Sequence, residues 1–387
     1  MDQCAICKGK GLCGQKVCPI VRKIYKATDT KSINEYMGPS PSVFIGSFGY
    51  PKVIGGPLMT TDSDNPLNWI QRGLSIGDIV NIRSNTIRGE KKIGVLNINT
   101  ESIGDIALSS SPIDIEVEFT KPVKYNLNSD DVIVPIGRSG PMKKMTVIDN
   151  AHVSNIVDRC VSDTDLHAVE AANILFENGT DIYKIINLLS SGLLGVKRKM
   201  VPTRWAITAT DNMISNKLKH DIFRMPAIPE YRVFSSTLHG QSHCFILIPA
   251  ADWRFEMIER SQKNTIWAKY NDWIMADQEQ GLTKSQYSPI GGSYYSARLA
   301  VLKYLKSIGY CANVICIHDI SPECWAPLGT WVIREASHAS FSNPPQLVGT
   351  ISEAISIANQ YIKDNFWVLY SSILKDLKYQ KRLFDFY

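Results

Sequence analysis

The sequence predicts an α+β protein with four parts: a small N-terminal zinc knuckle over residues 1–20, a strand-rich first half over 21–150, an α/β second half over 151–375 and a flexible C-terminal tail over 376–387. Three observations lead to this prediction. Four of the nine cysteines lie within the first eighteen residues. Up to residue 150, short apolar stretches alternate with glycine and proline, which is typical of short strands and turns. Beyond it, longer helical patterns alternate with apolar runs of strand length.

Composition sets broad limits. The chain has 387 residues, of which 44% are hydrophobic and 20% charged, so it is long enough for two or three packed units. The net charge of +5 permits contact with nucleic acid without requiring it. The first residues contain no apolar signal region, and no stretch approaches the roughly 20 apolar residues of a membrane span. We therefore expect a cytoplasmic protein that does not enter a membrane.

The N-terminal cysteines suggest a metal site. Cys4, Cys7, Cys13 and Cys18 have the spacing C-x2-C-x5-C-x4-C, with glycines between them that allow tight turns. Four thiolates suit a tetrahedral structural Zn²⁺, and a segment this short would take its folding energy from the metal. An iron–sulfur cluster is the alternative, because it also takes four cysteine ligands. A closed four-thiolate zinc site leaves no open position for catalysis.

The first half is expected to consist mainly of strands. The alternation of apolar and acidic residues over 113–119 predicts a half-buried strand. Glycine and proline are dense over 47–58, which predicts turns and a close approach of the backbone rather than regular structure. Such a loop could admit a phosphate or a base, or be purely structural. The remaining expectations are a helix over 21–36, a break at 38–41, strands over 42–46 and 132–135, and a turn at 138–141.

The second half is expected to alternate helices and strands. A strong helix should follow Ser293 as its N-cap, run through Ile308 and end at Gly309, because glycine is the usual residue just after a helix. The run 312–317 predicts a central strand. The other expectations are a helix start at 161–166 with Ser162 as N-cap, a buried strand over 201–208, a helix from Asp211, an amphipathic helix over 252–273, a strand over 331–335 and a helix or helix pair over 351–377.

Asp163 and Asp165, followed by His167 and Glu170, form a candidate acidic or metal site. The alternative is local, since acidic residues in a first helical turn offset the helix dipole and residues two apart do not share a helix face. Cys311, Cys316, His318 and Cys324 could form a second metal cluster, or be small core residues of a buried strand.

Two segments are candidates for binding a nucleotide or phosphate. Arg204 could clamp a phosphate while Trp205 stacks on a base, although a buried ion pair beside a core indole is equally compatible with the pair. Gly291, Gly292 and Ser293 precede a helix whose backbone N–H groups could hold an anion, with Arg298 one turn further on. The alternative for this segment is a tightly packed helix entry.

The last residues carry the most specific motif. Gln380, Leu383, Phe386 and Tyr387 fit Q-x-x-L-x-x-F-Y, the pattern of the PIP box with which proteins dock on the sliding clamp PCNA. A plug of one aliphatic and two aromatic residues suits a preformed apolar pocket on a partner. The alternative is the frayed end of a C-terminal helix whose aromatic residues pack on the domain.

Several segments in order resemble the archaeal Nre DNA-repair family. They are the four-cysteine head, residues 38–46 and 49–53, residues 201–208, residues 291–298, the turn at 327–329 and the tail. The resemblance spans nearly the whole chain and implies a role in DNA-damage repair with docking on PCNA through the tail. It supplies no catalytic residues. The leading hypothesis is a clamp-recruited repair factor that contacts DNA or a nucleotide; a non-catalytic adaptor is the alternative, and whether the protein is an enzyme stays open.

Overall fold

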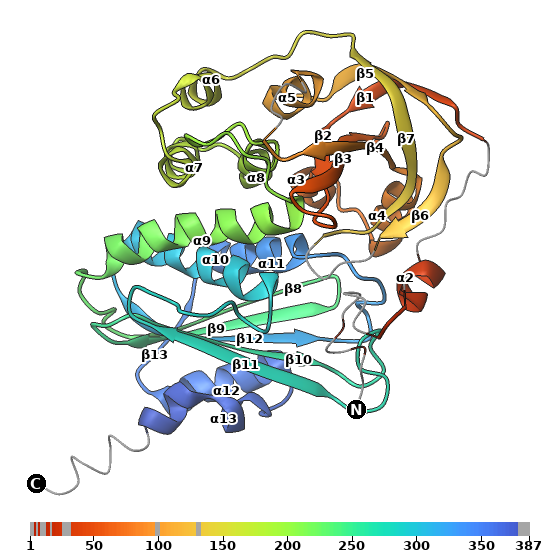
Figure 1. The fold of residues 1–387 in the computed structure, drawn as a ribbon. Coiled ribbons are helices and arrows are strands. Elements are labelled where there is room, and N and C mark those ends of the chain that lie inside the picture. Colours follow the sequence, from red (N-terminus) through yellow and green to blue (C-terminus); the bar gives the residue numbers. More distant parts are fainter. Residues whose placement is uncertain are drawn as a thin grey trace, which may run out of the picture. The chain divides into compact units, whose positions relative to one another are not determined.

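The computed structural model describes Cys4, Cys7 and residues 13–15, 18–24, 32–96, 101–128 and 133–377. The chain divides into two units, which are treated separately below (Figure 1). Unit 1 comprises Met1–Lys8, Ser215–Trp325 and Thr330–Tyr387, and unit 2 comprises Gly9–Ile214 and Ala326–Gly329. The fold is mixed α+β with a strand-rich first half, as the sequence predicted. Among the described residues, no helix is long and apolar enough to cross a membrane.

Unit 2 is built on a seven-stranded sheet with the order β1-β5-β7-β4-β3-β2, and β6 pairs with β7. All pairings are antiparallel except that of β4 with β7. β5 has the alternating burial expected from its sequence, with Ile113, Ile115 and Val117 in the core. The strands are β1 (Glu35–Ser40), β2 (Ser42–Ile45), β3 (Lys52–Met59), β4 (Ile87–Gly94), β5 (Ile113–Phe119), β6 (Lys124–Asn128) and β7 (Ile136–Val147).

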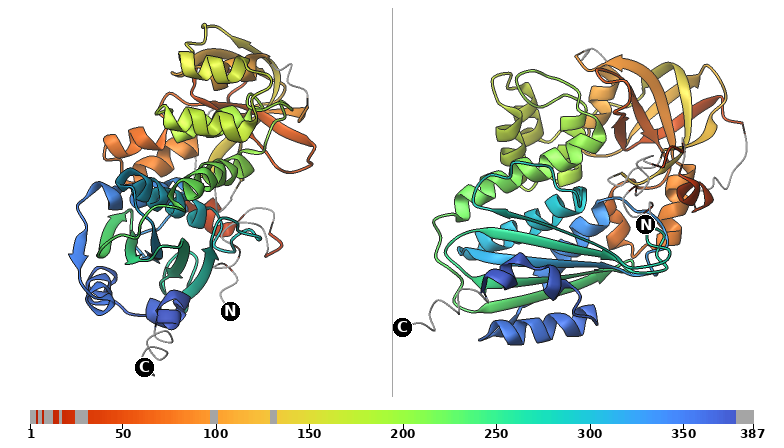
Figure 2. Two further views of the ribbon diagram at one scale, coloured as in Figure 1. Left: turned by 90° about the vertical axis from the view of Figure 1, so that its left-hand side faces the viewer. Right: turned by 60° about the horizontal axis from the view of Figure 1, so that its bottom comes forward.

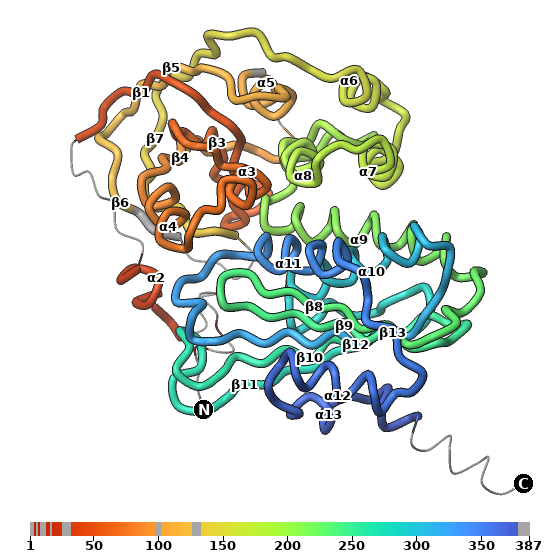
Figure 3. The backbone as a smooth tube through the Cα atoms, turned by 180° about the vertical axis from the view of Figure 1, so that it is seen from behind, coloured from red at the N-terminus to blue at the C-terminus, as the bar shows by residue number. Residues whose placement is uncertain are grey.

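Helices α4, α5 and α8 of unit 2 contact this sheet, whereas α6 packs on α7 and α7 packs on α8 (Figure 3). α6, α7 and α8 share an apolar core with the first half of α9, which includes Leu175, Leu188 and Ala206. The helices are α2 (Pro19–Ile24), α3 (Pro66–Gln71), α4 (Ile76–Asn85), α5 (Glu101–Leu108), α6 (Asn155–Ser162), α7 (Ala168–Glu177), α8 (Ile182–Ser190) and α9 (Thr203–Ile222). The division between the units falls within α9.

Unit 1 is a three-layer arrangement around a six-stranded sheet with the order β11-β10-β12-β9-β8-β13. Helices α10 and α11 cover one face, and α12 and α13 cover the other (Figure 2). The strands are β8 (Tyr231–Leu238), β9 (Gln241–Pro249), β10 (Arg254–Ser261), β11 (Trp273–Gln280), β12 (Ala312–Ile320) and β13 (Gln346–Val348). The helices are α10 (Gly292–Ile308), α11 (Trp331–Ser342), α12 (Ile351–Ile362) and α13 (Trp367–Tyr370).

Two expectations in unit 1 are confirmed. β12 is an internal strand, buried at nearly every position, and pairs in parallel with β10 and antiparallel with β9. α10 ends at Ile308, and Gly309 takes the left-handed conformation at its C-cap with φ of 73°. Glycine adopts this conformation without the steric penalty of a side chain, which is why the sequence marked the helix end correctly.

A buried carboxylate fixes the last described helical turn, residues 372–377. Glu256 on β10 is 2% exposed and accepts hydrogen bonds from the Ser371 hydroxyl at 2.7 Å and from the Ser372 amide at 2.6 Å. The Ser372 hydroxyl donates to the same carboxylate at 2.8 Å. A carboxylate at a helix N-terminus satisfies amide groups that have no partner within the helix. The end of the described chain is therefore attached to the sheet.

Three predictions of element type were wrong. Residues 201–208 begin helix α9 rather than a strand, and the Pro202 carbonyl accepts the first helical hydrogen bonds, from Trp205 at 2.8 Å and Ala206 at 2.9 Å. Residues 331–335 begin helix α11 rather than a strand. Residues 252–273 contain strand β10 rather than an amphipathic helix, and the charged residues Glu256, Glu259 and Arg260 of β10 are buried within polar networks. In each case tertiary packing outweighed local propensity.

The region 47–58 was wrongly predicted as wholly irregular, since strand β3 begins at Lys52. Its Gly56 approaches β4 so closely that a Cβ there would lie 2.2 Å from the Gly89 carbonyl oxygen. The hydrogen-bond ladder between β3 and β4 is interrupted at Gly56 and Pro57. Pro57 can therefore stand in β3 although it has no N–H to donate to β4. Here glycine marks a close strand–strand approach rather than a loop.

Other boundaries differ from the predictions. In place of a helix over 21–36, α2 covers Pro19–Ile24 and β1 begins at Glu35. Residues 38–41 were expected to interrupt regular structure after that helix, but Gly38 to Ser40 belong to strand β1. Neither the strand over 132–135 nor the turn at 138–141 is present among the described residues, which enter β7 at Ile136. Ser162 ends α6 instead of capping a new helix.

Candidate functional site

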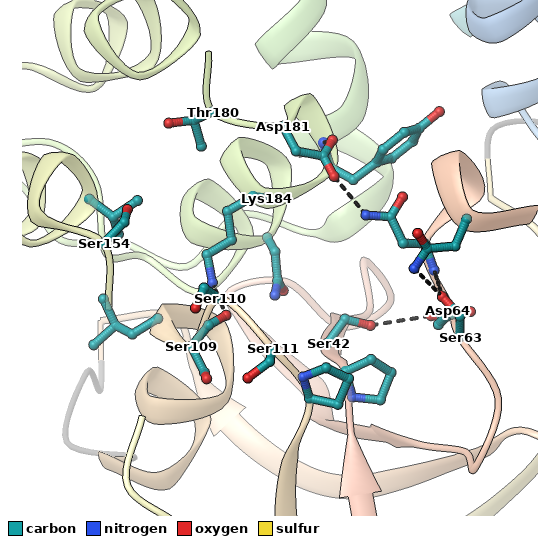
Figure 4. Close-up of a pocket in the computed structure, with 18 of the residues that line it drawn as sticks. Ser42, Ser63, Asp64, Ser109, Ser110, Ser111, Ser154, Thr180, Asp181 and Lys184 are labelled. Carbon is teal, nitrogen blue, oxygen red and sulfur yellow. Dashed lines mark hydrogen bonds between the residues drawn. The ribbon is translucent and has the colours of Figure 1, made fainter. Parts of the chain in front are cut away.

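Unit 2 contains a polar pocket of about 490 Å³ (Figure 4). Its lining comes from segments far apart in the sequence: the start of β2, the entry to α3, the end of α5 and the helices α6 and α8. Polar groups on the lining include Ser42, Asp64, Asn65, Ser109, Ser110, Ser111, Ser154, Thr180, Asp181, Lys184 and Asn187. The hydroxyl and amide groups suit a small ligand that forms several hydrogen bonds.

Lys184 holds one wall of this pocket in place. Its Nζ donates a hydrogen bond to the Ala107 carbonyl oxygen at 2.6 Å and another to the Ser109 carbonyl oxygen. A cation at these positions satisfies carbonyls at the C-terminal end of α5 and complements its dipole. Burial lowers the pKa of Lys184 to about 8, an effect that Asp181 partly opposes. The amine therefore fixes α5 against α8.

The two carboxylates of the pocket also have structural partners. Asp181 is the N-cap of α8, where it accepts from the Tyr183 amide at 2.9 Å and from the Asn65 side chain at 2.6 Å. Asp64 forms an ion pair with Arg83 and accepts from the Ser42 hydroxyl at 3.2 Å. Each carboxylate is thus engaged in holding the elements that surround the pocket, which leaves the neutral groups to contact a ligand.

The predicted acidic site lies elsewhere in unit 2. Asp163 and Asp165 are exposed in the link between α6 and α7, outside the pocket lining. Asp163 Oδ1 accepts from the amides of Asp165 and Leu166, both at 3.0 Å. This is the local turn that a short acidic side chain stabilises. The first turn of α7 is completed by Glu170, which accepts from the His167 amide at 3.3 Å.

Arg204 and Trp205 lie in the first turn of α9 in unit 2. Trp205 is 43% exposed, and its ring lies 5.2 Å from that of Tyr50, centroid to centroid. The Gly291–Arg298 segment belongs to unit 1, so the two predicted nucleotide-binding segments are parts of different units. Sequence pattern identified Trp205 as a candidate, but nothing in the sequence linked it to Tyr50.

The helix entry at 291–298 is tightly packed. Gly291 has φ of 81° and serves as the N-cap of α10, and a Cβ on Gly292 would lie 2.4 Å from the Thr330 hydroxyl. Ser293 is partly exposed at the same turn. Arg298 is fully buried and forms an ion pair with Glu279 at 2.6 Å. The arginine is therefore part of the interior of unit 1.

A polar network within the sheet of unit 1 was not predicted. His318 lies between the carboxylate of Glu259 and the side-chain oxygen of Gln241, each at 3.0 Å, and its ring stacks on His243 at 4.3 Å. The Gln241 amide also donates to the sulfur of Cys324 at 3.3 Å. Its members come from β9, β10 and β12 and from the connection that follows β12. Because the sequence predicted a helix where β10 lies, no spacing indicated the network.

Among the described residues, no group of three or more His, Cys, Asp or Glu side chains could hold a metal ion. This applies to Cys311, Cys316, His318 and Cys324. It applies also to the N-terminal cysteines, of which Cys7 is buried, Cys18 is partly buried, and Cys4 and Cys13 are exposed. The division between the units falls between Cys7 and Cys13. Zinc binding stays a prediction that rests on the chemistry of four clustered thiols.

The predicted clamp motif, Gln380, Leu383, Phe386 and Tyr387, lies outside the described residues, which end at Leu377.

Comparison with known proteins decides the family. The protein-family model described as "Archaeal Nre, N-terminal" matches residues 12–268, and the family model described as "Archaeal Nre, C-terminal" matches residues 279–386. The chain belongs to the archaeal Nre family. The resemblance noted in the sequence is thereby confirmed. No solved structure matches this Nre chain.

The similarity extends along almost the entire Nre chain. DNA repair protein NreA of Archaeoglobus fulgidus is 30% identical over 94% of this chain and 95% of its own length. DNA repair protein NreB of the same organism is 33% identical over 99% of both chains. DNA repair protein NreA of Haloferax volcanii is 27% identical over 91% of this chain and 88% of its own.

Proposed function

We propose that this Nre protein is a DNA-repair factor that the PCNA sliding clamp recruits through the tail motif Gln380–Tyr387 and that contacts DNA or a nucleotide. The observation that carries the repair role is its similarity, over 91% of the chain or more, to three proteins named DNA repair proteins. Because the similarity spans both units and the C-terminal family model extends to residue 386, the role is assigned to the whole chain.

The clamp interaction rests on the motif. Phe386 and Tyr387 supply the aromatic anchors, and Leu383 supplies the aliphatic contact, for an apolar pocket on the clamp. Lys375 and Lys378 precede the motif, and Lys381 and Arg382 lie within it. These positive charges would speed the encounter with an acidic clamp surface.

The test is a calorimetric titration of the full-length protein with PCNA. Changing Phe386 and Tyr387 to alanine is expected to abolish measurable binding, because hot-spot anchors carry most of the binding energy. The matched control changes Leu369 and Tyr370, which are exposed near the same end of the chain, and should leave the affinity unchanged. Unaltered affinity in the Phe386/Tyr387 variant would refute clamp recruitment through this motif.

A non-catalytic adaptor is the second candidate function. It is favoured by the observation that Lys184, Asp64 and Asp181 in the pocket all have structural partners. A cell-survival assay after DNA damage separates the two through Asp163, whose carboxylate also stabilises a local turn. An enzyme with acidic catalysis there loses repair in the Asp163→Ala variant at a temperature where that variant is still folded, whereas an adaptor retains repair.

We propose in addition that Cys4, Cys7, Cys13 and Cys18 bind one structural Zn²⁺. The support is the donor set, because four thiols within fifteen residues are the ligands that structural zinc prefers. The role would be to stabilise the fold of the N-terminal segment.

A further inference from the structure

Three of the exposed large aromatic side chains of unit 2 lie in two segments that the fold brings together. Phe48 is 92% exposed, Trp205 43% and Tyr50 37%. Phe48 and Tyr50 lie in the connection between β2 and β3, and Trp205 lies at the start of α9. The Tyr50 and Trp205 rings meet at 5.2 Å with a tilt of 51°, so their exposed surfaces form one continuous apolar feature. Contiguous exposed apolar surface on a folded protein usually marks an interaction site.

The backbone beneath these rings is held in place by hydrogen bonds between segments distant in the sequence. The Val95 amide donates to the Pro51 carbonyl at 3.0 Å, and the Met200 amide donates to the Val95 carbonyl at 2.9 Å. The Ile45 amide donates to the Thr203 hydroxyl at 2.9 Å. These bonds fix the β2–β3 connection next to the start of α9. The Tyr50 and Trp205 rings are thus held against each other before any ligand arrives, which reduces the entropy lost on binding.

Positive charge accompanies the aromatic rings. The segments 47–54 and 196–205 together contain five basic residues and no acidic residue. The Lys199 ammonium lies 4.9 Å from the centroid of the Tyr50 ring, and Lys52 and Lys197 are exposed. Arg198 has a structural role instead, because it donates to backbone carbonyls that include that of Val161 at 2.5 Å. Lysines beside exposed aromatic rings match the two chemical features of a nucleic-acid strand.

We propose that Phe48, Tyr50 and Trp205, with Lys52, Lys197 and Lys199, form a binding surface for single-stranded DNA. Unpaired bases stack on the rings, and the ammonium groups contact the phosphates that flank them. Duplex DNA binds more weakly here, since its bases are already stacked on one another. This inference rests on the proposed function for the choice of DNA, and it extends that function by naming the form of DNA and the residues that bind it.

The test measures fluorescence anisotropy of a labelled oligothymidylate titrated with full-length protein. The variants Phe48→Ala and Trp205→Ala are each expected to weaken binding by roughly fivefold or more, as for the loss of one stacking contact. Phe48 is almost fully exposed, so its variant keeps the fold even if the Trp205 variant is destabilised. The matched control is Tyr270→Ala in unit 1, another exposed aromatic residue with a lysine beside it, and it should leave affinity unchanged.

Two further measurements sharpen the test. Lys199→Gln should weaken binding and reduce the slope of log affinity against log salt by about one, as for a lost phosphate contact. A duplex of the same length should bind more weakly than the single strand. The proposal would be overturned if Phe48→Ala and Trp205→Ala bound the oligothymidylate with the same affinity as the parent. The same holds if these variants lost only binding to a protein partner and kept their DNA affinity.

The outcome is separable from clamp recruitment. The Phe386/Tyr387 double variant should bind the oligothymidylate like the parent, and the Phe48 and Trp205 variants should bind PCNA like the parent. Failure of clamp binding would therefore leave the single-stranded DNA result interpretable, and failure of DNA binding would leave the tail result intact.

Discussion

The Glu279 carboxylate forms an ion pair with the Arg298 guanidinium at 2.6 Å, and both side chains are fully buried. The Lys219 ammonium lies 3.3 Å from the same carboxylate and is also fully buried. The Trp253 indole donates to it at 3.1 Å. One carboxylate thus contacts three donors within unit 1, and a buried charge that loses its partner is strongly destabilising.

The variant Glu279→Gln is expected to lose about 3–5 kcal/mol of unfolding free energy, because it leaves two buried cations without this carboxylate. Urea unfolding followed by circular dichroism measures the loss. The control is Glu118→Gln, which removes the carboxylate of an exposed pair with Lys143 and should cost less than about 1 kcal/mol. Similar losses in the two variants would contradict the assignment of Glu279 as the centre of a buried network.

The pH dependence of stability should report on the same carboxylate. Burial alone would raise the pKa of Glu279, but Arg298 and Lys219 outweigh it and hold the pKa below its usual value. The folded state therefore keeps the charge at a pH where the unfolded chain binds a proton. The resulting stabilisation is present above the ordinary carboxylate pKa and is lost as pH falls through the lowered one. Urea titrations at successive pH values should show a smaller acid-induced loss for Glu279→Gln than for the parent.

Lys184 should give a pH dependence of the same sign in an alkaline window, although its cause is burial rather than ion pairing. Burial lowers its pKa to about 8, so between pH 8 and the usual lysine range the unfolded chain binds more protons than the folded one. Stability contributed by this group therefore rises with pH across that window. As pH is raised from 7.5 to 10, the unfolding free energy of the parent should increase relative to that of Lys184→Met. A difference that is constant over this range would contradict the lowered pKa.

Gly137 on β7 should not tolerate a side chain. A Cβ at this position would lie 2.1 Å from the Ser84 carbonyl oxygen, and backbone atoms cannot move aside cheaply. We expect Gly137→Ala to destabilise the protein by roughly 1–3 kcal/mol, as measured by thermal unfolding. The control is Gly104→Ala within α5, where the nearest atom is 3.8 Å away; this change should stabilise the helix by about 0.5–1 kcal/mol.

The proposed zinc site predicts one zinc ion per chain by native mass spectrometry with metal analysis. Cys13→Ser should lower the zinc content, because a closed tetrahedral site requires all four ligands. Cys160→Ser, which changes a buried cysteine of α6, should leave the zinc content unchanged and serves as the control. Iron with visible absorbance in the purified protein would instead support the iron–sulfur alternative, and the absence of both metals would refute the site.

Elements with a strong local signal were predictable. The alternation of β5 and the glycine after α10 both act within a few residues, so the sequence alone was sufficient. β3 and β10 were not, since their character depends on distant partners. Gly56 meets Gly89, and the carboxylate of Glu259 meets His318. A charge pattern that resembles a solvated helix face becomes a buried strand only when such partners are present.

The candidate sites also depend on residues that are distant in the sequence, which a local pattern cannot indicate. The Arg204–Trp205 pair suggested a base-binding segment, but only the fold shows that the Trp205 ring meets Tyr50 and that Lys199 lies over the Tyr50 ring. The pocket beside Lys184 gathers residues from 41–65, 108–112 and 154–187, and no spacing in the sequence connects them. Only the family resemblance led to the proposed repair role, since local chemistry did not indicate it.

The attachment of residues 371–373 to Glu256 limits how far the tail motif can lie from unit 1. Leu377 ends the described helical turn, and Gln380 is three residues further on, so at most about 11 Å of extended chain separates them. A clamp that grips the motif would therefore be held within about one helix diameter of unit 1. Recruitment would work as a short coupling rather than a long tether, so that unit 1 would stay close to the rim of the ring wherever the tail is bound.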